Sequence, residues 1–343
     1  MSQPRVTVLI AARDAKEFVT VSVRSALAQT YDGVQVLVVD DGSTDGTSEI
    51  LASLARSDSR VAVVRREGSG GLAAALAEGV QRVETEYIAR LDADDVALPN
   101  RIALQVSYLE ERRNVAVLGT ACEAFDATGG SQIWRMPGDP LAVRWRSLLA
   151  NPFLHPTVML RRSTLGDDLN YDSTLDVAQD YDLWCRVLRR GAGANLAEPL
   201  VRYRLHERTL TQTRREQQLA THDRIALRTM REVMPEIEMD ARTISDLRTL
   251  LFTDNAPKLD LRSLSATFLD LLETFVQKYG DTPGSSHLLR AESRRLIQVL
   301  VRRRAVRTLS AVGARLLRLD PGAPLELVAV AAGLARRPGL RRP

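Results

Sequence analysis

The sequence predicts an α/β fold: a doubly wound, mostly parallel sheet of the Rossmann-like kind, followed by an all-helical extension. Along the first half of the chain, apolar and β-branched runs typical of buried strands alternate with helical patterns. Beyond Thr213 the strand signals end and only helical periodicity continues. We therefore expect an α/β domain over residues 1–210 and a helical, arginine-rich region over 211–343.

The first half supplies four strands, each followed by a helix. Each expected strand is a short apolar run, and each expected helix keeps apolar residues on one face. The strands are expected at 5–11, 34–40, 60–65 and 86–92, and the helices at 17–28, 43–55, 71–83 and 99–111. In such sheets, ligands bind beyond the carboxyl ends of the strands.

The remaining pattern is looser up to about residue 206 and then purely helical. Short strands are expected near 115–120, 131–135, 157–161 and 200–205, with helices near 140–150 and 179–190. The later helices are expected at 213–232, 240–253, 262–279, 287–318 and 324–336. Breaks at Pro257, Pro283 and Pro321 separate several of them.

Composition excludes several classes of protein. Apolar residues make up 45% of the chain and charged residues 26%, which is ordinary for a soluble globular protein. Cys122 and Cys185 are the two cysteines and form no CxxC motif, so we expect neither a disulfide framework nor a zinc cluster, and a cytoplasmic location. The chain has no run of 18 apolar residues, and its first apolar run is too short for a signal peptide.

Positive charge is concentrated at the C-terminal end. The formal net charge is +4, but Ser286–Pro343 carries thirteen arginines against three acidic residues, a local net charge of +10. This asymmetry favours an anionic partner. Residues 287–343 could lie on the inner face of the plasma membrane, pack against the α/β domain or a second subunit, or form a solvated face. No nucleic-acid motif accompanies them, so a nucleic-acid partner is not expected.

An acidic pair lies at the end of the second expected strand, in VVDDGSTDGT at 38–47. Asp40 and Asp41 could accept hydrogen bonds from a nucleoside base or ribose. The alternative is a strand-to-helix turn in which Ser43 and Asp45 cap the helix.

A second acidic segment, LDADD at 91–95, follows the fourth expected strand. Asp92, Asp94 and Asp95 repel one another, and burying them unpaired is costly. Asp92 and Asp94 can serve one divalent cation bound to a diphosphate, because hard cations take oxygen ligands. The alternative is a solvated turn. The position after an apolar strand favours the metal.

Several motifs in a fixed order resemble those of family 2 glycosyltransferases, which have the GT-A fold. The first group is VTVLIAARDAKEFVTVSVRSALAQTY, VQVLVVDDGSTDGT, GLAAALAEGV, YIARLDADD and LPNRIALQVSYLE. Later motifs are NPFLHPTVMLRR at 151–162, AQDYDLWCRV at 178–187 and LVRYRLH at 200–206. The resemblance covers about residues 5–210.

This resemblance implies inverting transfer of a hexosyl group to an acceptor hydroxyl. The donor would be a nucleotide-diphosphate sugar, with a UDP-sugar favoured, and the cofactor a divalent metal, Mn²⁺ or Mg²⁺. The acceptor would be a glycan or a lipid-linked precursor, as in polysaccharide biosynthesis for a bacterial cell envelope. Residues 1–115 would bind the nucleotide-sugar, and 116–210 would face the acceptor.

The resemblance also implies roles for individual residues. The nucleotide-binding positions are Ala11, Arg13, Asp40, Asp41, Arg66 and Asp92. The metal positions are Asp94 and His206, and the general base is Asp180. The acceptor-side positions are His155, Gln179 and Trp184.

Three of these roles have a structural alternative. Asp180 could simply cap its helix, His155 could be a hydrogen-bonded structural residue, and Trp184 could belong to the core. Asp182 is a rival for the base but lies two positions further into the helix. The family usually has Glu where this chain has Gln179, which we expect to alter acceptor contacts rather than abolish the chemistry.

The assigned chemistry is physically consistent. A metal neutralises the departing diphosphate, so a single carboxylate near a helix N-terminus suffices for the acceptor proton. A nucleotidyltransferase is a rival hypothesis, but Ala11–Asp14 lacks the Gly-rich basic loop typical of that class. A non-catalytic nucleotide-binding or scaffold relative is the second rival, and Asp94 and Asp180 argue against it.

Overall fold

The computed structural model describes residues 5–166, 170–205, 215–253, 259–280 and 284–323. These residues form two compact units. The first contains the described residues up to Arg144 together with those of Asn151–His222, and the second contains Trp145–Ala150 together with the described residues from Asp223 onward. The boundary predicted near residue 210 falls outside the described residues.

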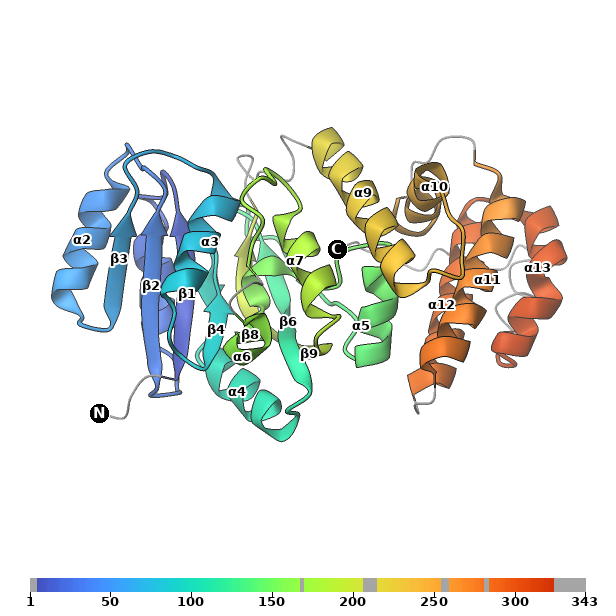
Figure 1. The fold of residues 1–343 in the computed structure, drawn as a ribbon, viewed down its shortest axis with the longest axis horizontal. Helices are drawn as coiled ribbons and strands as arrows, with labels where there is room; N and C mark the ends of the chain where they lie inside the picture. The colour runs from blue at the N-terminus through green and yellow to red at the C-terminus, as the bar shows by residue number, and fades with distance from the viewer. Residues whose placement is uncertain (1–4, 167–169, 206–214, 254–258, 281–283, 324–343) are drawn as a thin grey trace. The chain divides into compact units, whose positions relative to one another are not determined.

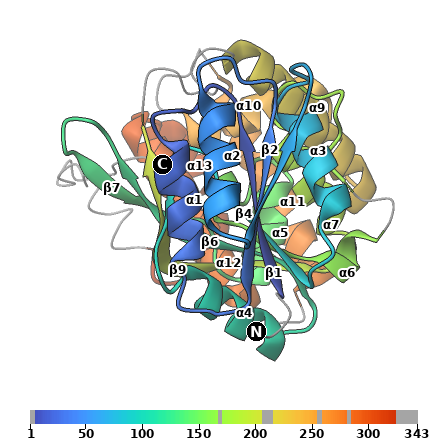
Figure 2. The same cartoon turned by 90° about the vertical axis from the view of Figure 1, so that its left-hand side faces the viewer.

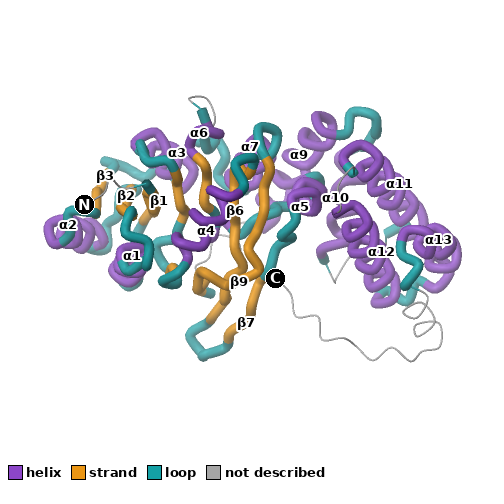
Figure 3. The backbone as a smooth tube through the Cα atoms, turned by 90° about the horizontal axis from the view of Figure 1, so that it is seen from below, coloured by secondary structure: helices purple, strands orange, loops and turns teal. Residues whose placement is uncertain are grey.

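A nine-stranded sheet forms the centre of the first unit (Figures 1 and 3). Its main path runs β3-β2-β1-β4-β8-β6-β9-β5, and β7 pairs with β6. The strands are β1 (Val6–Ala12), β2 (Val34–Asp40), β3 (Val61–Arg65), β4 (Tyr87–Arg90), β5 (Val96–Ala97), β6 (Val115–Phe125), β7 (Ser131–Trp134), β8 (Met159–Arg161) and β9 (Ala192–Arg204). The first four strands are parallel, and β8 is antiparallel to both β4 and β6. The predicted α/β fold is confirmed.

Helices cover both faces of this sheet, which explains why its strands are continuous apolar runs. Figure 2 shows α1 and α2 on one side of the strands and α3 on the other. The core on one face takes residues from α1 (Val19–Leu27), α2 (Thr47–Ser57) and α4 (Arg101–Glu111). The core on the other face takes residues from α3 (Leu72–Arg82), α5 (Pro140–Ser147), α6 (Arg162–Leu165) and α7 (Gln179–Val187).

Strand register brings the strand ends to one edge of the sheet. Ala12 of β1 lies opposite Asp40 of β2, and Asp40 lies opposite Arg65 of β3. The residues that follow these strands therefore emerge side by side. β4 stops earlier, with Arg90 opposite Leu9, and the acidic turn follows it at the same edge.

Two strand predictions needed correction in length. β9 begins at Ala192 rather than near residue 200, because its first half pairs in parallel with β6. β6 runs on to Phe125 rather than ending near residue 120, because it also pairs with β7. These partners are distant in sequence, and the local pattern does not contain them.

In the described residues of the second unit from Asp223 onward, the regular secondary structure is helical. The helices in this part of the chain are α9 (Arg215–Val233, which starts in the first unit), α10 (Ala241–Phe252), α11 (Leu261–Tyr279), α12 (Gly284–Arg302) and α13 (Val306–Leu319). Within this unit Trp145 packs edge-on against Phe268 and Phe275, with ring centroids 5.7 and 5.2 Å apart.

The single helix expected over 287–318 is wrong, because the chain breaks between α12 and α13, where Arg304 has a left-handed φ of 54°. The helix expected at 324–336 lies outside the described residues. None of the described helices combines the length and apolar character needed to cross a bilayer.

Candidate functional site

The acidic turn after β4 gathers three carboxylates. One oxygen from each of Asp92, Asp94 and Asp95 lies within 4.8 Å of the others. The turn is closed by a backbone hydrogen bond of 3.3 Å from the Asp95 N–H to the Asp92 carbonyl. An all-oxygen set of this kind fits a hard divalent cation.

The end of β9 holds this turn in place. The Arg204 backbone N–H donates to Oδ1 of Asp95 at 2.8 Å, and the Arg204 Nε donates to the Asp94 carbonyl at 3.0 Å. Arg204 belongs to the LVRYRLH motif, so this motif contacts the acidic turn directly. His206, the second predicted metal ligand, lies outside the described residues.

A buried arginine lies at the end of β4, just before the acidic turn. Arg90, the last residue of β4, is only 2% exposed and forms an ion pair with Asp92. Its Nε and Nη2 atoms are buried and have no hydrogen-bond partner among the described residues. Arg90 is absent from the predicted site residues, although an arginine inside the apolar run YIAR is a usable signal, because a buried charge needs a partner.

The electrostatics of the turn favour a cation. Burial raises the pKa of Asp92, against the opposing effect of Arg90. Burial also raises the pKa of Asp95 well above its usual range, and the charges of Asp92 and Asp94 add to that shift. If Asp92, Asp94, Asp95 and Arg90 were all ionised, these four groups would together carry a net charge of −2. The donor set therefore fits one divalent metal ion, which would relieve the repulsion among the carboxylates.

The ends of β1, β2 and β3 bring together three predicted nucleotide-binding residues. The Arg66 Nη1 donates to Asp41 at 2.5 Å, and the Arg13 Nη1 donates at 2.5 Å to Ser69, whose hydroxyl donates in turn to Asp41 at 2.8 Å. The backbone N–H groups of Gly70 and Gly71 also donate to the Asp41 carboxylate, both at 2.9 Å. Asp41 thus organises the loop after β3.

The other predicted nucleotide residues differ in their placement. Asp40 is fully buried, and its carboxylate accepts hydrogen bonds from the Ser43 N–H at 3.0 Å and from the Ser48 hydroxyl. This is the strand-to-helix turn that the sequence left open as the alternative. Of its two expected caps, Asp45 accepts a hydrogen bond of 3.0 Å from the Thr47 N–H at the start of α2, whereas the Ser43 hydroxyl accepts from the Asp14 N–H instead. Ala11 lies half-buried near the end of β1.

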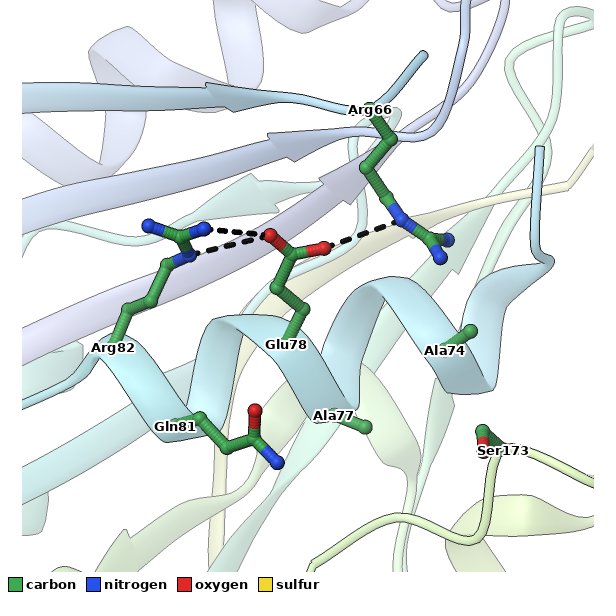
Figure 4. A pocket seen from close by; sticks show the side chains of 7 residues that line it. All are labelled: Arg66, Ala74, Ala77, Glu78, Gln81, Arg82 and Ser173. Carbon is green, nitrogen blue, oxygen red and sulfur yellow. Dashed lines mark hydrogen bonds and ion pairs between the residues drawn. The ribbon is translucent and has the colours of Figure 1, made fainter. Parts of the chain in front are cut away.

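Figure 4 shows a hollow beside this loop, on the outer side of α3. Its volume is about 500 Å³. Glu78 lies between Arg66 and Arg82, at 3.2 and 2.8 Å, so its charge is compensated from both sides. The residues lining the hollow do not include the three aspartates of the acidic turn.

The predicted base stands at the start of α7. Asp180 is the second residue of the helix, which follows Ala178 in a left-handed conformation with φ of 58°. The Asn151 Nδ2 donates to Oδ2 of Asp180 at 2.7 Å. The charge of Asp180 contributes to the raised pKa of Asp92, so the two carboxylates lie within electrostatic reach. The rival Asp182 is 2% exposed and pairs with Arg186 at 2.7 Å.

The three predicted acceptor-side residues lie on α7 or beside it. The His155 Nε2 forms a hydrogen bond of 2.9 Å with the Tyr171 hydroxyl, and burial lowers the pKa of His155 well below its usual range. Gln179 is 7% exposed. Trp184 is fully buried and packs on Phe153, so it belongs to the core, as the alternative stated, and does not reach a surface where a sugar could stack on it.

Known proteins resemble this chain in sequence. A family model described as Glycosyl transferase family 2 matches residues 7–192. A protein of Haemophilus influenzae named as a glycosyltransferase is 29% identical over 257 residues, which cover 72% of this chain and 80% of that protein.

Solved structures show the same fold. TarS of S. aureus, in complex with UDP-GlcNAc, has a TM-score of 0.57 at 17% identity, covering 97% of this chain and 93% of that one. The mannosyltransferase PcManGT from Pyrobaculum calidifontis, in complex with GDP-Man and Mn²⁺, has a TM-score of 0.52 at 20% identity, covering 97% and 88%. The chain therefore has the fold of these transferases, as the sequence predicted.

Proposed function

Because the chain belongs to glycosyltransferase family 2, we propose that it moves a hexose, with inversion, from a nucleotide-diphosphate sugar to an acceptor hydroxyl. The observation that carries the proposal is the acidic turn of Asp92, Asp94 and Asp95 within electrostatic reach of Asp180, at the carboxyl ends of the parallel strands β1–β4. Family membership removes the nucleotidyltransferase alternative. A non-catalytic relative is the remaining rival.

A divalent metal, Mn²⁺ or Mg²⁺, would be held by Asp94 and, directly or through water, by Asp92. When bound, it would stabilise the negative charge of the departing diphosphate. Arg13 and the loop organised by Asp41 and Arg66 would contact the nucleotide. A uridine nucleotide is our first choice, and guanosine is tested beside it because the two structural relatives contain UDP-GlcNAc and GDP-Man.

Asp180 would act as the general base. Its carboxylate takes the proton of the acceptor hydroxyl while the hydroxyl oxygen forms a bond to the anomeric carbon and the bond from that carbon to the diphosphate breaks. The proton ends on Asp180, and the negative charge leaves with the nucleoside diphosphate. The neutral Gln179 beside it adds no second carboxylate to the acceptor side.

The acceptor in this proposal is a glycan or a lipid-linked precursor in polysaccharide biosynthesis. The arginine-rich part of the chain would bring the enzyme to an anionic membrane. Arg304, just before α13, and Arg307, in its first turn, are exposed, as is the apolar side chain of Val306 at 58%. Other arginines of this region are engaged: Arg294 pairs with Asp320, and Arg315 with Glu273. The surface available to lipid is therefore smaller than the charge count suggests.

The decisive experiment is calorimetric titration with UDP and GDP, with and without Mn²⁺. The wild-type protein is expected to bind one of them in a metal-dependent manner, and Asp94→Asn is expected to lose that dependence. Glu84→Gln is the matched control, because Glu84 is an exposed carboxylate after α3. If folded wild-type protein binds neither nucleotide, the transferase proposal is wrong and the scaffold hypothesis stands.

The base assignment has a separate test. Asp180→Asn is expected to bind nucleotide normally but to lose transfer by about 100-fold or more, the usual contribution of a positioned general base. A variant that still transfers at nearly the wild-type rate would show that another group takes the proton.

A further inference from the structure

We propose that Asn151 is the positioning residue for Asp180: it holds one oxygen of the carboxylate and thereby presents the other to the acceptor hydroxyl. The inference rests on the proposed function, since it takes Asp180 as the base. Its starting point is the hydrogen bond of 2.7 Å from the Asn151 Nδ2 to Oδ2 of Asp180.

A second hydrogen bond settles the orientation of the Asn151 amide. Its Oδ1 accepts a hydrogen bond of 3.1 Å from the backbone N–H of Phe153. A backbone N–H can only donate, so the oxygen must face Phe153 and the NH₂ group must face Asp180. Asn151 is therefore a fixed donor to the carboxylate.

The backbone on either side of this contact is also constrained. Pro152 restricts the preceding Asn151 to extended conformations, and the Pro152 carbonyl accepts a hydrogen bond of 3.2 Å from Asn195. Phe153 is 2% exposed and packs edge-on against Trp184, with ring centroids 5.8 Å apart. Trp184 lies four residues after Asp180, on the same side of α7. The Asn151 donor and the Asp180 carboxylate are thus both close in sequence to the packed pair of Phe153 and Trp184.

This arrangement has a chemical consequence. A carboxylate near a helix start can rotate about its side-chain bonds, whereas a base must be held to within about 0.5 Å of its productive position. The amide of Asn151 supplies that restraint without competing for the proton, because an amide does not titrate near neutral pH. Holding Oδ2 leaves Oδ1 of Asp180 for the acceptor.

Asn151→Asp separates this role from a structural one. The new carboxylate has the same shape and can still accept the Phe153 N–H, but it presents an oxygen to Asp180 in place of a donor. We expect release of nucleoside diphosphate from UDP-GlcNAc or GDP-mannose, with Mn²⁺ and water as acceptor, to fall in kcat by about 100-fold. The KM for the donor and the affinity for UDP or GDP should stay within threefold of wild type. Asn100→Asp, an exposed asparagine outside the site, is the matched control.

The exchange variant, Asn151→Asp with Asp180→Asn, provides a second test. It restores a donor–acceptor pair but moves the carboxylate to position 151. The melting temperature should return towards that of the wild type while kcat stays low. Recovery of kcat together with stability would show that the pair acts only structurally, which would overturn the inference.

A crystal structure of Asn151→Ala supplies a readout that needs no activity. We expect the Asp180 carboxylate to move by more than about 0.5 Å or to adopt several rotamers. A carboxylate that keeps its wild-type position would overturn the inference. In the assay, normal kcat in Asn151→Asp with an inactive Asp180→Asn would overturn the inference alone. Normal kcat in Asp180→Asn would overturn the base assignment itself.

Discussion

Arg90 shows how a single buried charge supports the acidic turn. It lies at the end of an apolar strand, pairs with Asp92, and its carbonyl accepts a hydrogen bond of 2.6 Å from Arg101. Removing one member of a buried ion pair leaves the other charge uncompensated in a medium that solvates it poorly.

We therefore expect Arg90→Met to lower the free energy of unfolding by about 3 kcal/mol. Urea denaturation followed by circular dichroism measures the change. Arg65→Met is the control, since Arg65 is an exposed arginine on β3, and it should change stability by less than about 0.5 kcal/mol. Equal stability of Arg90→Met and wild type would mean that the pair contributes nothing.

His155 predicts a pH dependence of stability. Burial and the positive charge of Arg90 lower its pKa well below the usual range, so the folded protein keeps it neutral while the unfolded chain protonates it near pH 6.5. The unfolded state then binds more protons below that pH. The stability contribution of His155 is complete above about pH 6.5 and is lost as the pH falls below it.

Through this one proton, the free energy of unfolding is expected to fall by at most about 1.4 kcal/mol for each pH unit below 6.5. His155→Gln, which keeps a polar group for Tyr171, should flatten the dependence between pH 6.5 and 5 in urea denaturation. His287→Gln, the same substitution at an exposed position on α12, is the control. An unchanged slope in His155→Gln would contradict the expected effect.

At the scale of elements, the start of α7 is a strained junction. Ala178 has a φ of 58°, a left-handed conformation that costs a residue with a β-carbon about 1 kcal/mol. Strain of this kind is common at functional sites. Here it immediately precedes Gln179 and Asp180.

Ala178→Gly should therefore raise the free energy of unfolding by up to about 1 kcal/mol, less the cost of losing a buried methyl group. Thermal unfolding measures the change. Ala77→Gly, inside α3, should have the opposite sign and cost about 1 kcal/mol, since glycine is unfavourable within a helix. A destabilised Ala178→Gly would show that the packing of the methyl group outweighs the strain.

At the scale of the whole molecule, charge is distributed unevenly over the chain. Residues 286–343 carry a net charge of +10, and the first 285 residues carry −6. Several arginines in the helical unit are paired, but Arg304 and Arg307 are exposed beside Val306. An anionic membrane attracts each such arginine by about 1 kcal/mol.

The double variant Arg304→Glu with Arg307→Glu should bind phosphatidylglycerol vesicles about thirtyfold more weakly than wild type in sedimentation at low salt. Neutral phosphatidylcholine vesicles should bind neither protein. Arg56→Glu with Arg65→Glu, an equal charge change at exposed positions in the first unit, is the control. If both double variants lost vesicle binding equally, the net charge of the protein, and not the surface around Arg304 and Arg307, would account for the binding.

Much of the fold could be predicted because the signals are local. Runs such as VQVLVVD are apolar on both faces, which only a covered parallel strand explains, and the helices between them carry one apolar face. The acidic turn after β4 was predictable for the same reason, since a strand end and its carboxylates are adjacent in sequence.

Other features could not be predicted, because they depend on partners far apart in the chain. The first half of β9 exists through its pairing with β6, and the break at Arg304 has no proline or glycine to announce it. Asp40 and Trp184 match family positions in sequence, but both side chains are fully buried and pack or form hydrogen bonds within the protein.

The sequence by itself determined the order of the elements, the family and the position of the acidic turn, because all three follow from residues close together along the chain. Only the tertiary structure decided that Arg90 pairs with Asp92 and that Asn151 meets Asp180 across 29 positions. Hydrogen bonds and ion pairs of this kind act over a few ångströms, so they form only once packing has brought distant segments together.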